Sequence, residues 1–324
     1  MPRFILKLLV TTAILFLLFR RIDANELSQA LSQTSYRLFT LALLFLFIIL
    51  ILPAISQKIL FKGCRLDLKA GSIYNINLKS MFYSLVVPGD LASGLARFLK
   101  FSRAHRGARP SEGEIGQSVL VVMAVDRFLN MAAVIAPIPF LLLVSPLPDK
   151  TIWFQKASSL AAILFFLGAL IGHRCPLKKI FSLINRGALK KIGKTLERMT
   201  ETFQDLPTRT LSASFTICLV YQIAGIFLID IVLAKSLGLD LPWLTFFSMA
   251  AVIRFARYIP VTLSGIGVRE GLFPLFLVSY GVPFETALTL GLLGSVIVIL
   301  AGLVGGLLEG YETYFSTSSS TARR

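Results

Sequence analysis

The stretch Leu38–Gln57 reads LFTLALLFLFIILILPAISQ and carries no charged side chain over its twenty residues. An α-helix rises about 1.5 Å per residue, so a stretch of about 20 apolar residues crosses the hydrocarbon core of a bilayer. Three further charge-free runs are as long and as apolar: Phe128–Pro148, Thr210–Ile229 and Thr286–Leu308. These runs predict an all-α polytopic membrane protein.

Two weaker apolar runs raise the expected number of full spans to six. Phe4–Phe19 is interrupted only by Lys7, and we expect a first span over 4–21. The residues after it lack the small-x-small cleavage site of a signal peptide, so this span is expected to stay uncleaved, with a cleaved signal peptide as the alternative. The second run, Ala157–Gly172, reaches spanning length over 151–173.

The composition agrees with a membrane location. Of the 324 residues, 55% are hydrophobic and 15% are charged, whereas an ordinary soluble domain is about 25% charged. These values exclude disordered, collagen-like and coiled-coil chains and argue against a cytosolic enzyme. The net charge of +16 is also found in nucleic-acid-binding proteins, but Lys and Arg collect in the cytoplasmic loops of membrane proteins, so we expect no nucleic-acid partner.

The basic residues predict the orientation of the chain. Loops 58–79, 97–109 and 174–209 contain 5, 5 and 9 Lys and Arg residues. The positive-inside rule places these loops, together with both termini, in the cytoplasm. We therefore expect a multi-pass protein of the cell (plasma or inner) membrane. Within the third loop, 178–206 has the pattern of an amphipathic helix lying on the inner leaflet, and 316–324 is expected to be a disordered polar tail.

Two apolar stretches, Met81–Phe101 and Trp243–Tyr280, are interrupted by residues that break helices. Such residues leave backbone groups without partners at membrane depth, which is tolerated only where protein or a watery cavity covers them. We interpret both stretches as re-entrant helical hairpins. The residues expected to shape them are Pro88, Gly89, Gly94, Pro260, Gly265 and Gly267.

A shift of about 172 residues aligns the two hairpins and their flanking spans. Leu66-Asp67-Leu68 then meets Leu239-Asp240-Leu241, and each hairpin proline precedes an arginine by nine residues, from Pro88 to Arg97 and from Pro260 to Arg269. This spacing predicts an inverted repeat, typical of secondary transporters, over about 36–145 and about 210–310. Chance similarity between leucine-rich spans is the alternative.

Ionisable residues inside predicted membrane segments are the candidate site, because such residues are costly and usually face a cavity or a partner. Arginine is a bidentate donor suited to phosphate, so Arg97, Arg127, Arg257 and Arg269 are predicted to bind a lipid phosphate. The acidic residues Asp90, Asp126 and Glu270 are predicted to balance charge or carry protons. The alternative is a purely structural pairing role. Arg254 lies one turn before Arg257, whereas Asp230 and Glu285 lie at predicted span ends and are expected to be solvated.

Motifs for other chemistries are absent. The sequence contains no Walker A loop and no GxSxG or HExxH motif, and its three cysteines form no CxxC pair. We therefore expect no metal, no cofactor and no catalytic residue.

The segment Ile259–Gly271, IPVTLSGIGVREG, resembles the signature of the lysylphosphatidylglycerol synthase transmembrane region, a flippase-like family. Pro88-Gly89-Asp90 through Arg97 and Val125-Asp126-Arg127 resemble the earlier motifs of that family, although a second glycine before Asp90 is missing. The resemblance covers 4–310.

The resemblance implies a protein that moves an anionic phospholipid or a polyprenyl-phosphate lipid between leaflets. The soluble aminoacyl-transferase domain of the larger synthases is expected to be absent, because the chain ends about fifteen residues after its last span; we therefore expect a translocator that is not an enzyme. Two alternatives stay open: a membrane-embedded lipid-modifying transferase, and a non-catalytic membrane partner of a separate synthase or glycosyltransferase.

Overall fold

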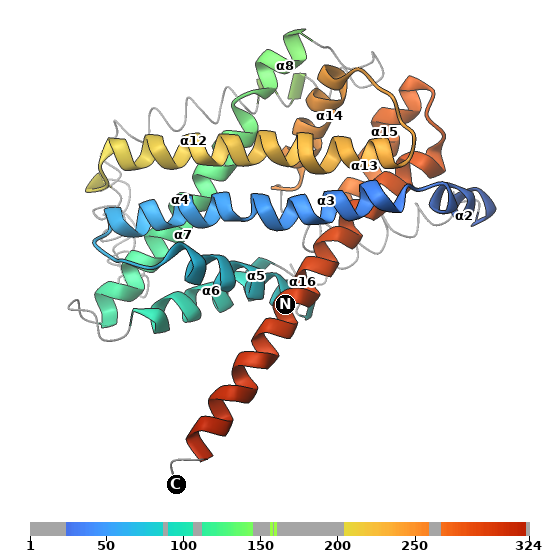
Figure 1. Ribbon diagram of the computed structural model, residues 1–324. Coiled ribbons are helices and arrows are strands. Elements are labelled where there is room, and N and C mark those ends of the chain that lie inside the picture. Colours follow the sequence, from blue (N-terminus) through green and yellow to red (C-terminus); the bar gives the residue numbers. More distant parts are fainter. Residues whose placement is uncertain are drawn as a thin grey trace, which may run out of the picture. The chain divides into compact units, whose positions relative to one another are not determined.

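The computed structural model describes residues 24–86, 90–105, 112–144, 156–157, 159–160, 204–258 and 267–321 (Figure 1). This described part is helical and contains no strand. Its elements are α2 (Ala24–Ser32), α3 (Tyr36–Ile49), α4 (Ile51–Gly63), α5 (Ala70–Val86), α6 (Asp90–Ala104), α7 (Glu112–Ile135), α8 (Ile138–Val144), α12 (Thr208–Gly225), the π-helical turn η3 (Ile226–Asp230), α13 (Ile231–Ser236), α14 (Trp243–Ala256), α15 (Val268–Leu277), the 3-10 turn η4 (Val278–Tyr280) and α16 (Phe284–Thr321).

Four helical stretches in the described residues are long and apolar enough to cross a membrane: Tyr36–Gly63, Ile115–Leu142, Thr208–Ser236 and Phe284–Tyr314. They contain or overlap the four charge-free runs, so the chain is a multi-pass α-helical membrane protein. The second span begins earlier than the run Phe128–Pro148, because α7 continues through Asp126 and Arg127. Asp126 is buried within the protein and hydrogen-bonded there, which is why the helix tolerates it.

Several predicted segments lie outside the described residues. These are the first span over 4–21, all but four residues of the span over 151–173, and 178–203 of the amphipathic segment. Of the residues expected to shape the hairpins, Pro88, Gly89, Pro260 and Gly265 also lie outside the described part.

Each interrupted stretch contains two of the described helices. In the first, α5 ends at Val86 and α6 begins at Asp90, and Gly94 lies inside α6. In the second, α14 ends at Ala256 and α15 begins at Val268. Gly267 precedes α15 with φ of +88°, a left-handed conformation that glycine adopts without a steric penalty.

The last helix extends beyond its predicted end. α16 continues through Thr321, so the tail over 316–324 that is predicted to be disordered overlaps the last six residues of this helix. Ser and Thr are only a few tenths of a kcal/mol poorer as helix formers than average residues, and no Gly or Pro follows Gly310. The long apolar helix before them supplies the nucleus that a short polar segment lacks.

The chain divides into two compact units. The first comprises Met1–Ile49, Tyr74–Arg97 and Ala224–Arg324, and the second comprises Leu50–Ile73 and Phe98–Ile223. Within the first unit, α3 contacts η3 and α13, and α15 packs against α16. Within the second, α4 contacts α7.

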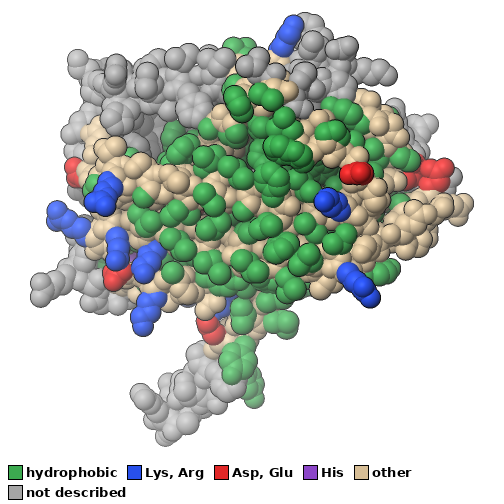
Figure 2. All heavy atoms as spheres, turned by 45° about the horizontal axis from the view of Figure 1, so that its top comes forward, with side chains coloured by type: hydrophobic (Ala, Val, Ile, Leu, Met, Phe, Trp, Pro, Cys, Tyr) green, Lys and Arg blue, Asp and Glu red, His purple; other side chains and the backbone are tan. Residues whose placement is uncertain are grey.

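Exposed apolar side chains cover the spanning helices. Examples are Leu44 (55% exposed) and Ile48 (57%) on α3, and Leu307 (74%) on α16. Hydrophobic side chains dominate the face drawn in Figure 2, where acidic and basic side chains are few. Exposed apolar side chains in such numbers are typical of a protein embedded in lipid.

Candidate functional site

The first compact unit contains a buried carboxylate, Asp230, at the end of η3. The Ile231 N–H donates to the Ile226 carbonyl, which is the longer hydrogen-bond spacing of a π-helix and places one extra residue in the turn. Asp230 is 3% exposed, so the expectation that it is solvated at a span end is wrong. Its side chain points toward the interior of the protein.

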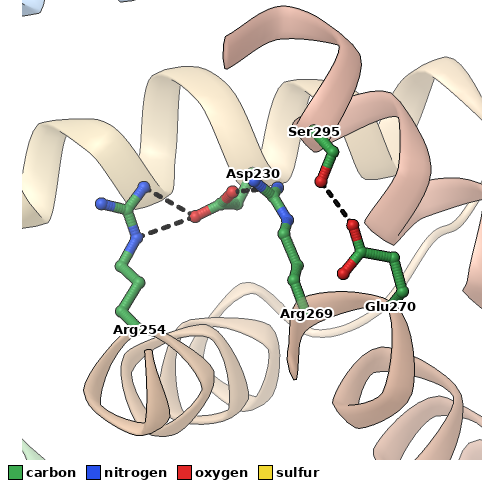
Figure 3. Close-up of polar contacts among 5 residues, drawn as sticks. All are labelled: Asp230, Arg254, Arg269, Glu270 and Ser295. Carbon is green, nitrogen blue, oxygen red and sulfur yellow. Dashed lines mark hydrogen bonds and ion pairs between the residues drawn. The ribbon is translucent and has the colours of Figure 1, made fainter. Parts of the chain in front are cut away.

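Two arginines from separate helices bind this carboxylate (Figure 3). Arg254 of α14 donates from Nε and Nη2 to Asp230 Oδ2, at 3.0 and 2.8 Å. Arg269 of α15 donates from Nη2 to Asp230 Oδ1, at 2.7 Å. Each carboxylate oxygen is therefore bound by a different guanidinium, and charge-assisted hydrogen bonds of this kind are the strong ones.

Glu270 links the start of α15 to α16. Its Oε2 accepts the Gly267 N–H at 2.8 Å, which satisfies a backbone donor at the helix N-terminus. Its Oε1 accepts the Ser295 hydroxyl at 2.5 Å, as Figure 3 shows. Glu270 is thus a capping residue, and it also fixes the helix turn that presents Arg269 to Asp230.

Glycines make room for these side chains. A Cβ at Gly294 would collide with the Arg269 guanidinium, and a Cβ at Gly291 would lie 2.9 Å from the Glu270 Cα. A Cβ at Gly225 would lie 2.8 Å from Nη1 and Nη2 of Arg254. The three glycines let α12 and α16 approach both arginines closely.

The other predicted residues of the first unit lie around or away from this cluster. Arg257 is exposed at the end of α14, one turn after Arg254. Arg97 is half-buried on α6, the helix that begins at Asp90. The structure brings Arg269 and Glu270 together with Asp230 and Arg254.

The second unit contains a different polar cluster, around Asp126 of α7. Gln57 Nε2 donates to Asp126 Oδ2 at 2.9 Å, and Asn130 Nδ2 donates to Asp126 Oδ1 at 3.3 Å. Gln222 Nε2 lies 3.5 Å from Asn130 Oδ1. Asp126 is 7% exposed, whereas Arg127 is exposed. The two neighbours in the motif therefore face different surroundings.

Sequence reasoning missed Asp230 as a partner of the arginines, and it missed Gln57, Gln222 and Ser295. A signal for Asp230 was present. It is the only Asp, Glu, Lys or Arg between Thr210 and Ala234, and an acidic residue in so long an apolar stretch usually has a functional partner. No comparable signal marks the amides and the serine, which are common in spans.

No group of three or more His, Cys, Asp or Glu residues that could hold a metal ion is present among the described residues. The cluster around Asp230 consists of guanidinium and carboxylate groups. Such groups can bind, exchange or release an anion.

A comparison with protein families gives a match over most of this chain. The family described as the lysylphosphatidylglycerol synthase TM region matches residues 4–306. No curated protein matches the chain.

Proposed function

Because the chain belongs to the lysylphosphatidylglycerol synthase transmembrane-region family, which gives it a function related to membrane lipids, we propose that it translocates an anionic lipid between leaflets. The substrate class is a phospholipid or a polyprenyl-phosphate lipid. The protein recognises the phosphate of this lipid, and the arginines of the first unit bind that phosphate.

The observation that carries this proposal is the pair of arginines that converges on Asp230. A carboxylate whose two oxygens are bound by two guanidinium groups presents the geometry that a phosphate also accepts. Asp230 would hold the two arginines in place until a lipid phosphate replaces it at one of them. Arg254 is the more accessible of the two, with its side chain 17% exposed against 9% for Arg269.

The charge balance of the cluster supports an anionic substrate. Three arginines, Arg254, Arg257 and Arg269, face only two carboxylates, Asp230 and Glu270. Among these five described side chains one formal positive charge is left over, and Arg257 is the exposed arginine of the three. A lipid phosphate arriving at Arg257 would balance that charge.

The architecture proposed for this activity is six full spans and two re-entrant helical hairpins in an inverted repeat. The division of each stretch into two helices, α5 and α6 in the first and α14 and α15 in the second, supports the two hairpins. Both termini are proposed to lie in the cytoplasm, in the plasma or inner membrane. Arg97, Arg127, Asp90 and Asp126 remain proposed members of the transport path, with the acidic residues balancing charge or carrying protons.

The test is lipid sidedness in proteoliposomes that contain the purified protein, followed by dithionite quenching of fluorescent anionic and zwitterionic lipids. The wild-type protein is expected to expose the protected anionic lipid. Arg254→Ala, Arg257→Gln and Arg269→Ala are each expected to slow that exposure about tenfold or more, which corresponds to about 1.4 kcal/mol per factor of ten. Arg209→Gln, an exposed arginine at the start of α12, is the matched control and is expected to leave the rate unchanged.

Arg257→Gln keeps the test decisive, because this exposed side chain is removed without opening the buried cluster. Equal rates in the wild type, Arg257→Gln and Arg209→Gln would overturn the proposed role of the arginines. A chemically altered lipid in mass spectra of the vesicles would instead favour a transferase. Activity seen only when a synthase or glycosyltransferase co-purifies would favour a partner protein.

A further inference from the structure

An open groove of about 590 Å³ lies beside the end of the third described span. Its wall includes α13, the turn that follows it and the start of α14. The residues that matter for its chemistry are Phe227, Lys235, Asp240, Trp243 and Phe246. None of them belongs to the arginine cluster described above.

The end of the span indicates the level of the groove in the membrane. The Leu239 N–H donates to the Ala234 carbonyl and the Gly238 N–H to the Lys235 carbonyl, and Gly238 has φ of +70°. This is the Schellman pattern that ends a helix. The groove therefore runs along the last turns of the span to its end, and Trp243 beside it is 60% exposed. Tryptophan at the end of a span is typical of the head-group level of a bilayer.

The groove offers two opposite charges that do not neutralise each other directly. Lys235 and Asp240 both line it and are both exposed. No ion pair or hydrogen bond joins them in the described part of the chain. A ligand with a phosphate and an ammonium group would match this pair, because the phosphate can face Lys235 and the ammonium group can face Asp240. A purely anionic head group would leave Asp240 without a partner of opposite charge.

Aromatic rings complete the lining. The ring centroids of Phe227 and Trp243 are 6.1 Å apart, and Phe246 stacks on Phe273 at 6.2 Å. Ring faces attract ammonium groups, and the same rings give the upper methylenes of an acyl chain an apolar contact. The π-helical turn contributes Phe227 to this wall, just as it contributes Asp230 to the arginine cluster.

We propose that this groove is a binding site for a zwitterionic phospholipid of the surrounding bilayer, with the phosphate on Lys235 and the ammonium group between Asp240 and the ring of Trp243. This lipid is a bound neighbour and not the transported cargo, so the site stands independently of the proposed translocation. Phe246 and Phe273 connect the groove to Arg269, whose Cζ lies 5.4 Å from the Phe273 ring centroid. The bound lipid would therefore pack against the aromatic side chains that support Arg269.

The experiment uses Trp243 as the reporter. The sequence contains two tryptophans, so a Trp153→Phe variant of the full chain leaves Trp243 as the only source of tryptophan fluorescence. The protein is reconstituted in mixtures of unlabelled lipid with either phosphatidylethanolamine or phosphatidylglycerol brominated near the top of the acyl chain. Quenching by each brominated lipid gives their relative association at this position.

The zwitterionic lipid is expected to bind about threefold better than the anionic one, the size of one exposed cation–π or ionic contact. Asp240→Asn is expected to abolish that preference or reverse it, because Lys235 then stays as the only charge. Asp67→Asn is the matched control, since Asp67 occupies the same Leu-Asp-Leu triplet in the other half of the chain and is also exposed. Asp67→Asn is expected to leave the lipid preference unchanged.

Three results would overturn the proposal. Quenching by neither lipid would show that the groove lies out of reach of the bilayer. Equal quenching by both lipids, or a preference for the anionic lipid in the unsubstituted groove, would show that its charges do not select a zwitterionic head group. An unchanged preference in Asp240→Asn would remove Asp240 from the site.

Discussion

Two buried aspartates in spans, Asp230 and Asp126, illustrate how the same side chain acquires different roles. Asp230 is bound by the guanidinium groups of Arg254 and Arg269. Asp126 accepts hydrogen bonds from the carboxamides of Gln57 and Asn130. These partners of Asp230 are therefore cations, whereas these partners of Asp126 are neutral amides. The cost of removing each carboxylate should therefore differ.

The largest effect is expected from truncating Asp230. Asp230→Ala leaves two arginines facing each other without their shared carboxylate, and removing one partner of a buried ion pair costs about 3–5 kcal/mol. Asp126→Ala removes hydrogen bonds to neutral amides and should cost about 1–3 kcal/mol. Denaturant unfolding of the two variants in the same detergent measures the difference. Equal losses of unfolding free energy would mean that the charged partners of Asp230 stabilise the protein no more than the neutral partners of Asp126 do.

A medium effect is expected where α16 passes the charged cluster. Gly294→Ala would push against the Arg269 guanidinium, and overpacking of this kind costs about 1–3 kcal/mol. Gly310 lies in the same helix, and a Cβ there would meet no other atom within 4 Å. Gly310→Ala should therefore stabilise the protein by about 0.4–1 kcal/mol, because it lowers the conformational entropy of the unfolded chain. Thermal unfolding of both variants tests the opposite signs. A stabilising Gly294→Ala would show that Arg269 does not need this space.

The smallest effect is expected at the edge of the amide cluster. Gln222→Met removes a long hydrogen bond to Asn130 while keeping the side-chain volume, and should cost about 0.5–1.5 kcal/mol. Thr216→Val on the same helix is the control, because Thr216 is exposed and bonds only its own helix, at the Ser212 carbonyl. If Gln222→Met cost as much as Asp126→Ala, the cluster would act as one unit instead of a centre with an edge.

The sequence predicted four of the expected spans, because hydropathy depends on local composition. Four charge-free runs became or overlap four long helices, whereas the span over 4–21 and most of the span over 151–173 lie outside the described residues. Arg269 and Glu270 were also predicted, since two charges beside a glycine run in an apolar stretch are conspicuous.

The partners of these residues could not be predicted in the same way. Asp230 was assigned to a solvated span end because hydropathy gives its depth along the helix but not its direction around it. That direction depends on how the surrounding helices pack, which leaves no compositional trace. The amides Gln57 and Gln222 are 165 residues apart in the sequence, and only the packing of α4, α7 and α12 brings them to the same cluster.

The π-helical turn gives this span one residue to spare. Deleting one residue from Phe227–Ile229 would restore an ordinary α-helical turn, in which each residue contributes about 100° of rotation and about 1.5 Å of rise. The Ile231 N–H would still bond the Ile226 carbonyl, because the wider turn spreads about the same rotation over one more residue. Asp230 would therefore keep its direction relative to α12 and would still point at Arg254 and Arg269. A one-residue deletion inside this turn should spare both the span and the charged cluster.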